Sequence, residues 1–441
     1  MNAEVRQMKT TAEQQIVAAW QEAKDRLPGP ASLREGAFRR FEAQGLPHRR
    51  VEEWKYTDLR ALMRDAKPLA APPDAAALAR ARDAGRLVGD VECRRIVFVD
   101  GAFAAELSDM VGLEPGLTVR PLAKALADGD PLVAAHLGKV VPAGGDPAVA
   151  LNTAFMGDGA VVRIAANTET ERPLNFVFVA AGERPAAMFT RSLVVVENGA
   201  RAMIMESHEA AGAVDYQINA GLELVIGDGA HVDHVKLIGE GDNALHISTL
   251  MARVGANARF NDFSFVLGGA VVRNQLYLDF RGNDTVATIG GVNLLKDKQH
   301  ADTTMVVVHD SLGCQSRQLF KSVLDEESRG VFQGKIIVKP HAQKTDGKMM
   351  SQALLLSEEA EMDNKPELEI FADDVQCGHG ATCGDLDEDL LFYLRARGIP
   401  AKEAEALLIQ AFIGEAVEHV EHARLREVLM EHVEGWLKAR G

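Results

Sequence analysis

Apolar and polar residues along the chain follow a helical spacing first, a strand-like spacing next, and a helical spacing again at the end. The first helical segment, "TTAEQQIVAAWQEA", begins at a threonine that can cap it and ends before a Pro-Gly-Pro stop. Further helices are expected around residues 75–85 and 120–137, with a short strand in "RRIVFVDGAF" between them. Residues 1–149 are therefore predicted to form an N-terminal helical domain with short strands.

From residue 150 the pattern becomes strand-like, with runs such as "PLNFVFVA" and "SLVVVENGA" bounded by turn residues. In "NQLYLDF", alternation predicts that Leu276, Leu278 and Phe280 face the core, opposite Gln275, Tyr277 and Asp279. Gly-Ala pairs begin at residues 199, 229 and 255, and Gly282 continues this irregular period of about 26–30 residues. Such a period favours the stacked coils of a β-solenoid over a β-sandwich, whose turns would recur at shorter intervals.

The strand pattern ends at a segment rich in aspartate, after which helical spacing returns. Asp385 or Asp387 can cap the first of these helices, Gly398 can end it, and Pro400 can begin the next. The expected apolar face of that second helix consists of Ala404, Leu407, Leu408, Ala411 and Phe412. The predicted fold is mainly β, with a parallel β-helix core over residues 150–385 and helical domains over 1–149 and 386–441.

Composition narrows the classes of partner. The 441 residues carry 64 acidic and 48 basic side chains, a net charge of −16, and only 5% aromatic residues. Nucleic acid is therefore not the expected partner. We expect no membrane association, since no apolar run has the length of a membrane span. Four cysteines and no export signal predict a reduced, cytoplasmic protein. No glycine-rich phosphate-binding motif occurs, so we expect no bound nucleotide.

The stretch "DDVQCGHGATCGDLDE" concentrates the candidate chemistry, with Cys377, His379 and Cys383 within seven residues. Residues two apart in a strand project to the same side, so Cys377 and His379 could bind one metal ion. A closed structural zinc site needs four ligands, and no second Cys-x-x-Cys pair is present. A site completed by a second protein is more plausible. A catalytic thiol is the weaker alternative, because a Cys and a His at i and i+2 rarely have the geometry for proton abstraction.

Other candidate residues have simpler interpretations. His231 and His234 are three apart, so in a strand they face opposite ways and should not share a metal. Cys93 is interpreted as a small packing residue. One further set is interpreted as a polar edge of the solenoid: His309, Asp310, Cys314, Lys321.

Two stretches resemble a known family. "RRVEEWKYTDL" and the long segment from "HDSLGCQSRQLFKSV" through "DDVQCGHGATCGDLDE" to "FYLRARGI" are similar to the SufB/SufD family of iron–sulfur cluster assembly subunits of the SUF system. The "EEWKYTDL" and "CGHGAT" segments favour the SufD branch over the SufB branch. The resemblance spans nearly the whole chain, and residues 60–150 are its least distinctive part.

This resemblance implies a right-handed parallel β-helix between two helical domains. It implies pairing with SufB through the β-helices and docking of SufC, an ABC-type ATPase, through the C-terminal helices. Cys377 and His379 match the family's Cys-x-His pair, a candidate site for a transient iron–sulfur cluster or metal shared with SufB. Gly378 stands where the family commonly has serine. Cys383 stands where an apolar residue is expected, so its role stays open.

The leading interpretation is a scaffold subunit that is not an enzyme, with a homodimer possible when SufB is absent. The alternatives are a SufB-like paralogue, an enzyme built on a β-helix, and a stand-alone metallochaperone. An enzyme would need convergent carboxylates or bases along the solenoid face, and no such cluster is visible in the sequence. A metallochaperone would retain bound metal as a single chain, whereas a scaffold subunit should lose it without its partner.

Overall fold

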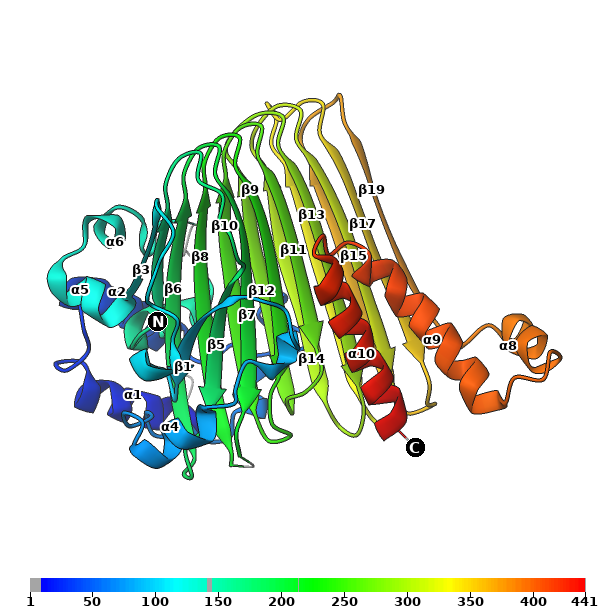
Figure 1. The fold of residues 1–441 in the computed structure, drawn as a ribbon, viewed down its shortest axis with the longest axis horizontal. Coiled ribbons are helices and arrows are strands. Elements are labelled where there is room, and N and C mark those ends of the chain that lie inside the picture. The colour runs from blue at the N-terminus through cyan, green and yellow to red at the C-terminus, as the bar shows by residue number, and fades with distance from the viewer. Residues whose placement is uncertain (1–8, 141–144, 213, 441) are drawn as a thin grey trace, which may run out of the picture.

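The chain forms a solenoid that alternates between two sheets, so each solenoid strand pairs in parallel with the strand two places further on (Figure 1). This computed structural model describes residues 9–140, 145–212 and 214–440. The predicted mainly β fold, a parallel β-helix between helical ends, is confirmed. In the described residues, the antiparallel pairs occur only at the N-terminal end of the solenoid, between β1 and β2 and between β3 and β4.

The strands of the ten-stranded sheet have the spatial order β19 (Gln376–Gly384), β17 (Asp346–Leu355), β15 (Gln315–Leu324), β13 (Val286–Leu295), β11 (Arg259–Val266), β9 (His231–Gly239), β7 (Arg201–Ala210), β5 (Leu174–Ala180), β1 (Arg94–Val99), β2 (Ala102–Phe103). Those of the nine-stranded sheet have the order β18 (Glu361–Ile370), β16 (Arg329–Val338), β14 (His300–His309), β12 (Val271–Phe280), β10 (Leu245–Val254), β8 (Tyr216–Ile226), β6 (Ala186–Val196), β4 (Ala160–Ile164), β3 (Leu117–Pro121). Because β1 pairs with β5 and β3 with β4, residues before 150 complete the start of both sheets.

Helices lie at both ends of the chain. The N-terminal helices are α1 (Thr11–Ala23), α2 (Ala31–Gln44), α3 (Leu59–Leu62), α4 (Ala75–Ala81), α5 (Leu122–Asp128), α6 (Pro131–His136), α7 (Pro147–Phe155). The C-terminal helices are α8 (Glu388–Arg395), α9 (Ala401–Val417), α10 (Ala423–Ala439). Short 3₁₀ turns occur at Glu52–Trp54, Arg86–Val88 and Ala105–Leu107. Thr10 caps α1 and Asp387 caps α8, as the sequence predicts, because their side-chain oxygens accept bonds from the first backbone N–H groups.

The space between the two sheets is the main core. Leu276, Leu278 and Phe280 of β12 are buried in it, as predicted from the alternation of that strand. The opposite face of the same strand is covered by the N-terminal part of the chain. There the side chains of Gln275 and Tyr277 both donate hydrogen bonds to Asp146. Strands covered on both faces become nearly continuous in apolar residues, which is why helical periodicity fades after residue 150.

The turns that lead into the ten-stranded sheet stack from coil to coil through their backbones. Each contains one residue with a left-handed backbone, and these residues are Asn167, Gly199, Gly229, Asn257, Asp284, Gly313, Lys344. The N–H of each donates to a carbonyl in the turn of the next coil; for example, Gly229 N lies 2.7 Å from Ala256 O. The Gly-Ala repeat in the sequence combines two different stacks of turn residues. Gly199 and Gly229 belong to the stack with left-handed backbones. Gly255 and Gly282 belong to a second stack, with Gly227, which lies just after the ends of their strands.

Replacing Gly282 by alanine is expected to destabilise the solenoid. A Cβ at Gly282 would lie 1.9 Å from the backbone nitrogen of Ala256 in the preceding coil. Because backbone cannot move aside as a flexible side chain can, Gly282→Ala should lower the free energy of unfolding by about 3 kcal/mol. Gly435→Ala in α10 is the matched control: it meets open space and should stabilise its helix by about 1 kcal/mol. Chemical denaturation measures both, and equal stabilities would contradict the stacking.

The "EEWKYTDL" segment anchors the N-terminal helices on the nine-stranded sheet. The Trp54 ring is buried, and the Arg273 guanidinium lies 3.8 Å from the centre of that ring. Arg273 also forms a buried ion pair with Asp302 and donates to the Glu53 carbonyl at 2.7 Å. Thr57 donates to the same Asp302 carboxylate. This part of the family resemblance therefore has a structural role in holding the N-terminal domain to the solenoid.

The C-terminal hairpin of α9 and α10 packs on the outer face of the ten-stranded sheet. The predicted apolar face of α9 is wrong in part, because Ile409 and Ile413 are buried while Leu407 is 42% exposed. This helix is apolar on most of its surface, so spacing alone does not select the buried face.

The interpretation of Lys321 as part of a polar solenoid edge is wrong. Lys321 is buried beneath α9, where it pairs with Glu415 and lies 4.2 Å from the ring centre of Phe412.

Candidate functional site

The candidate residues lie on β19, at the end of the solenoid that no element of the described chain covers (Figure 1). Strands β18 and β19 form the last coil, and each is the edge strand of its sheet. The other end of the solenoid is different, since β2 and β3 close it with short antiparallel pairs. Long open edges are sites where a strand of another chain can add.

Cys377, His379 and Cys383 all belong to one face of β19. The register pairs them with Gly347, Met349 and Ala353 of β17. Met349 is buried in the core between the sheets, so this face of β19 continues the inner surface of the solenoid. The shared face expected for Cys377 and His379 is therefore present, and Cys383 is on it too.

The three side chains differ in burial and in electrostatic setting. Cys377 is half-buried and packs against the core, while His379 and Cys383 are exposed. Burial raises the pKa of the Cys377 thiol above its ordinary value, against a smaller lowering by the backbone of Gly347. Partial burial also raises the pKa of the Cys383 thiol. Neither thiol is activated as a nucleophile by its surroundings, so the arrangement does not support covalent catalysis by either cysteine.

The described residues do not close a metal site around Cys377 and His379. Among the described residues, two clusters of His, Asp or Glu side chains lie close enough together to hold an ion. Neither cluster includes a residue of β19. Inner-face neighbours from β18 offer an amide and apolar groups instead. Asn364 accepts a hydrogen bond from Ser351 at 2.7 Å, and Leu368 packs on the core.

Backbone groups of the last coil also point away from the molecule. The Gln376 N–H donates to Thr345 O at 2.8 Å, so by alternation in a parallel ladder the N–H groups of residues 377, 379, 381 and 383 face the free edge. The same argument, from Glu361 N donating to Ser328 O, places the nitrogen of Pro366 on the free edge of β18. Proline is tolerated there because that position donates no bond within its own sheet.

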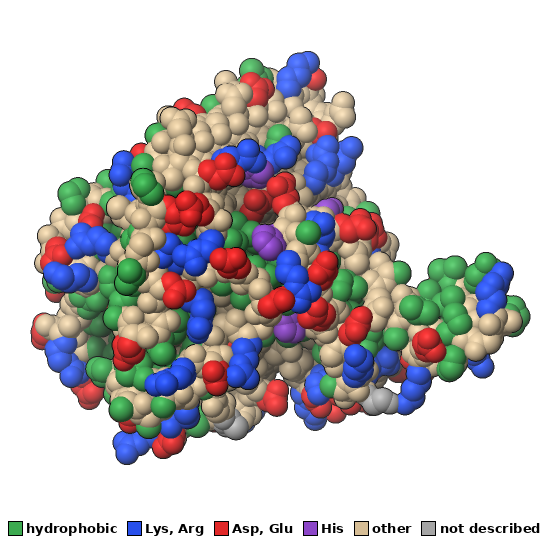
Figure 2. Space-filling view, in the orientation of Figure 1, with side chains coloured by type: hydrophobic (Ala, Val, Ile, Leu, Met, Phe, Trp, Pro, Cys, Tyr) green, Lys and Arg blue, Asp and Glu red, His purple; other side chains and the backbone are tan. Residues whose placement is uncertain are grey.

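A second exposed feature is α8, which projects from the end of the solenoid (Figure 1). Its apolar side chains Leu390, Phe392 and Tyr393 are 51%, 73% and 53% exposed. Figure 2 shows hydrophobic side chains gathered on the projecting lobe. Apolar side chains concentrated in this way are typical of a surface that another protein covers.

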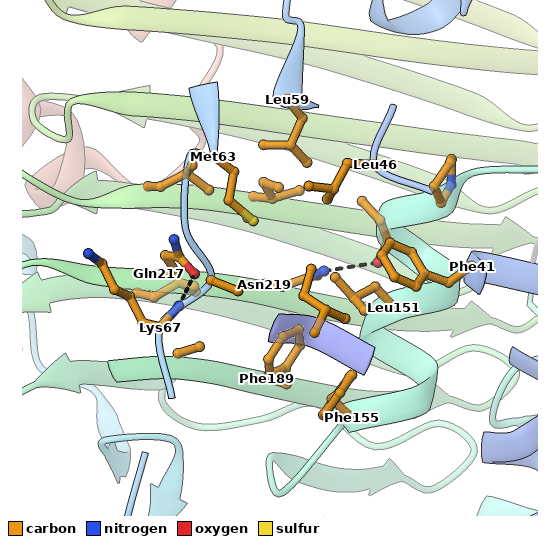
Figure 3. Close-up of a pocket in the computed structure, with 18 of the residues that line it drawn as sticks. Phe41, Leu46, Leu59, Met63, Lys67, Leu151, Phe155, Phe189, Gln217 and Asn219 are labelled. Atoms are coloured by element: carbon orange, nitrogen blue, oxygen red, sulfur yellow. Dashed lines mark hydrogen bonds between the residues drawn. The ribbon is translucent and has the colours of Figure 1, made fainter. Parts of the chain in front are cut away.

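The cavity between the N-terminal helices and the nine-stranded sheet has no catalytic character (Figure 3). Apolar side chains such as Phe41, Leu151 and Phe189 line it, and its volume is about 30 Å³. The hydrogen bonds at its wall are structural, such as Lys67 N to Gln217 Oε1 at 3.0 Å. A space of that size holds about one water molecule, so it is a packing gap.

A group of charged residues lies inside the solenoid and was not predicted from the sequence. His234 and His231 do face opposite ways, as predicted. His234, however, points inward and lies between Glu206, 2.9 Å from its Nε2, and Asp262, 2.6 Å from its Nδ1. Strand alternation could have predicted this group. Glu206 and His208 lie two and four residues after Ile204, so they share the inward face of the strand with the core residues Ala202 and Ile204.

Comparison with known proteins agrees with this fold. The SUF system FeS cluster assembly SufBD core domain matches residues 178–412, and the SufBD protein N-terminal region matches residues 13–176. An iron–sulfur cluster assembly SufBD family protein of Synechocystis sp. is 32% identical over 409 residues, 91% of this chain and 89% of the relative. The iron–sulfur cluster assembly protein SufD of Escherichia coli is 30% identical over 399 residues, 88% of this chain and 89% of the relative. SufD of Bacillus subtilis is 28% identical over 299 residues, 66% of each chain.

The solenoid, its helical ends and these matches define a component of SUF-system iron–sulfur cluster assembly. The chain belongs to the SufBD family, and relatives named SufD match most of its length. The family resemblance of the sequence is thereby confirmed. Across the described residues, none of the helices combines the length and the apolar character that a membrane span requires.

Proposed function

We propose that this chain is a non-catalytic scaffold subunit of SufD type that pairs with SufB through the open end of its solenoid. The observation that carries the proposal is the last coil, where two adjacent edge strands of ten and nine residues each have one edge that no strand of the described chain pairs. Strand addition from a second solenoid would satisfy the outward N–H and C=O groups and cover the half-exposed core end. A second copy of this chain could use the same edges when SufB is absent.

The cargo of this interface would be a transient iron–sulfur cluster. Cys377 and His379 would supply two ligands from this side, a thiolate and a neutral imidazole, which suit iron. The partner would supply the others, since the described residues do not complete the set. Cys383 lies on the same face of β19, so it is a third candidate whose contribution needs its own test. The assembly is proposed to work in the cytoplasm, and this chain binds no nucleotide itself.

The SufC ATPase is proposed to dock on the C-terminal helices, with α8 as its main contact. In support, α9 and α10 already cover the ten-stranded sheet, whereas the apolar side chains of α8 are exposed. Deleting residues 386–441 would therefore be a poor test, because it would also uncover the sheet. A point substitution on α8 separates docking from folding.

Phe392→Ala is expected to weaken ATPase binding while leaving stability unchanged. Phe392 is 73% exposed, so its removal costs little in the free chain. Buried aromatic anchors at interfaces are typically worth ~2 kcal/mol or more, which corresponds to a roughly 30-fold weaker Kd. Isothermal titration of SufC into each variant measures this. Leu312→Ala, at an exposed apolar residue in a solenoid turn, is the control and should bind normally. Equal affinity of both variants would place the ATPase elsewhere.

Co-purification from the protein's own cell extract tests the proposed function as a whole. A tagged full-length chain should capture a SufB-type subunit and a SufC-type ATPase, with the iron–sulfur cluster present only when SufB is. Recovery of the chain alone, fully loaded with metal, would instead favour the stand-alone metallochaperone. Turnover of a small substrate by the isolated chain would favour an enzyme.

A further inference from the structure

Three buried side chains meet inside the solenoid, at the end of the coils opposite the left-handed turns. They are His208 of β7, Glu240 in the loop after β9, and His246 of β10, with 0%, 4% and 0% exposure. One ligand atom of each lies within 4.8 Å of the others. The two imidazole rings are nearly perpendicular, at 83°, with 4.7 Å between their centres. Coil stacking thus brings two imidazoles and one carboxylate to a single point.

The histidines at this point lack the hydrogen bonds that buried polar groups normally make. Among the described residues, neither ring nitrogen of His208 has a hydrogen-bond partner, and Nε2 of His246 has none. His208 Nε2 lies 3.4 Å from Glu206 Oε2, an ion-pair distance without hydrogen-bond geometry. Only Nδ1 of His246 is paired, 2.9 Å from Glu240 Oε1. Because buried nitrogens are rarely left unpaired, these unpartnered ring nitrogens point to a ligand between the rings.

The carboxylates around the histidines are held in place by further contacts. The Tyr216 hydroxyl donates to Glu240 Oε2 at 2.6 Å. Glu206 is held by His234, which Asp262 positions in turn at 2.6 Å. Contacts that orient the ligating groups are the usual support of a metal site, because they fix the direction of the lone pairs before the ion arrives.

We propose that His208, Glu240 and His246 bind a divalent transition-metal ion inside the solenoid. Two imidazoles with one carboxylate suit Zn²⁺ and Fe²⁺. Ligand bonds of about 2.0–2.2 Å place ligand atoms roughly 3–3.5 Å apart, so the present spacing needs only a small adjustment. The site is separate from β19, and it does not rest on the proposed function.

A cavity of about 550 Å³ lies beside Tyr216 and is also lined by Met188, Gly212 and Val214. The Tyr216 hydroxyl contacts Glu240, so this side chain connects the wall of the cavity to the ligand cluster.

The experiment uses Co²⁺ as a spectroscopic probe on the full-length chain, stripped of metal with a chelator. One equivalent of Co²⁺ should bind and give the visible absorption of a low-coordinate nitrogen and oxygen site, and Zn²⁺ should displace it. Glu240→Gln, and His208→Phe, which retains a ring against Phe178, should each weaken binding by about 100-fold or more. His231→Ala is the control that should bind as the unaltered chain does.

Thermal unfolding without metal first establishes that the variants fold. If His208→Phe does not fold, the isosteric Glu240→Gln decides the result by itself. Absence of stoichiometric Co²⁺ binding in the unaltered chain would overturn the proposal. Binding that survives both substitutions, or that is lost only in His231→Ala, would do the same and would place the metal outside the solenoid.

Discussion

His379→Ala is expected to leave the chain folded and paired with SufB, yet to lower the cluster content of the complex about tenfold or more. The imidazole is exposed on the inner face of the edge strand, so its removal uncovers little apolar surface. Under the proposed function, the substitution removes a nitrogen ligand at the junction with the partner solenoid. Iron and sulfide content of the purified complex, together with rescue of a SUF-deficient strain, measures the loss.

The cysteines on the same face provide the graded comparison. Cys377→Ser should lower cluster content as much as His379→Ala or less, and Cys383→Ser should have the smallest effect. If Cys383→Ser proves the most damaging, the ligand set lies nearer the end of β19 than the Cys-x-His pair. A His379→Ala complex that assembles normally and builds clusters at the unaltered level would reduce this stretch to a structural element.

Ala381→Pro is expected to abolish pairing with SufB while the isolated chain stays folded. By alternation, the N–H of Ala381 faces the free edge of β19, so proline removes a donor that the ladder with β17 does not use. The ring also stands where a partner strand would approach, which blocks strand addition sterically. Size-exclusion chromatography of the co-expressed subunits should show separate chains in place of the heterodimer.

Ala381→Val is the matched control, because it adds side-chain volume but keeps the backbone donor. It should pair with SufB at close to the original affinity. Thermal unfolding of the isolated Ala381→Pro chain shows whether the solenoid end is intact. A folded Ala381→Pro variant that still forms the heterodimer would show that the partner approaches through another surface.

Much of the fold could be predicted from local patterns. The caps at Thr10 and Asp387 depend on a few consecutive residues, and both were predicted at or within a few residues of their observed positions. The coil period was readable because each coil needs a turn with a left-handed residue, and glycine often supplies it. The repeat was read imperfectly, since aspartate, asparagine and lysine fill the same turn position in other coils. For the site, strand alternation predicted correctly that Cys377 and His379 share a face.

The sequence by itself determined the solenoid, the helical ends and the face of β19, because each follows from a period that spans only a few residues. The tertiary structure alone decided which contacts form between coils. It joined His208 of β7 to Glu240 and His246 of the next coil, and it selected the buried side of α9 against the sheet. It also decided that the end bearing β18 and β19 is the open one. These outcomes depend on how separate segments stack, and that information is not contained in the periodicity of any one segment.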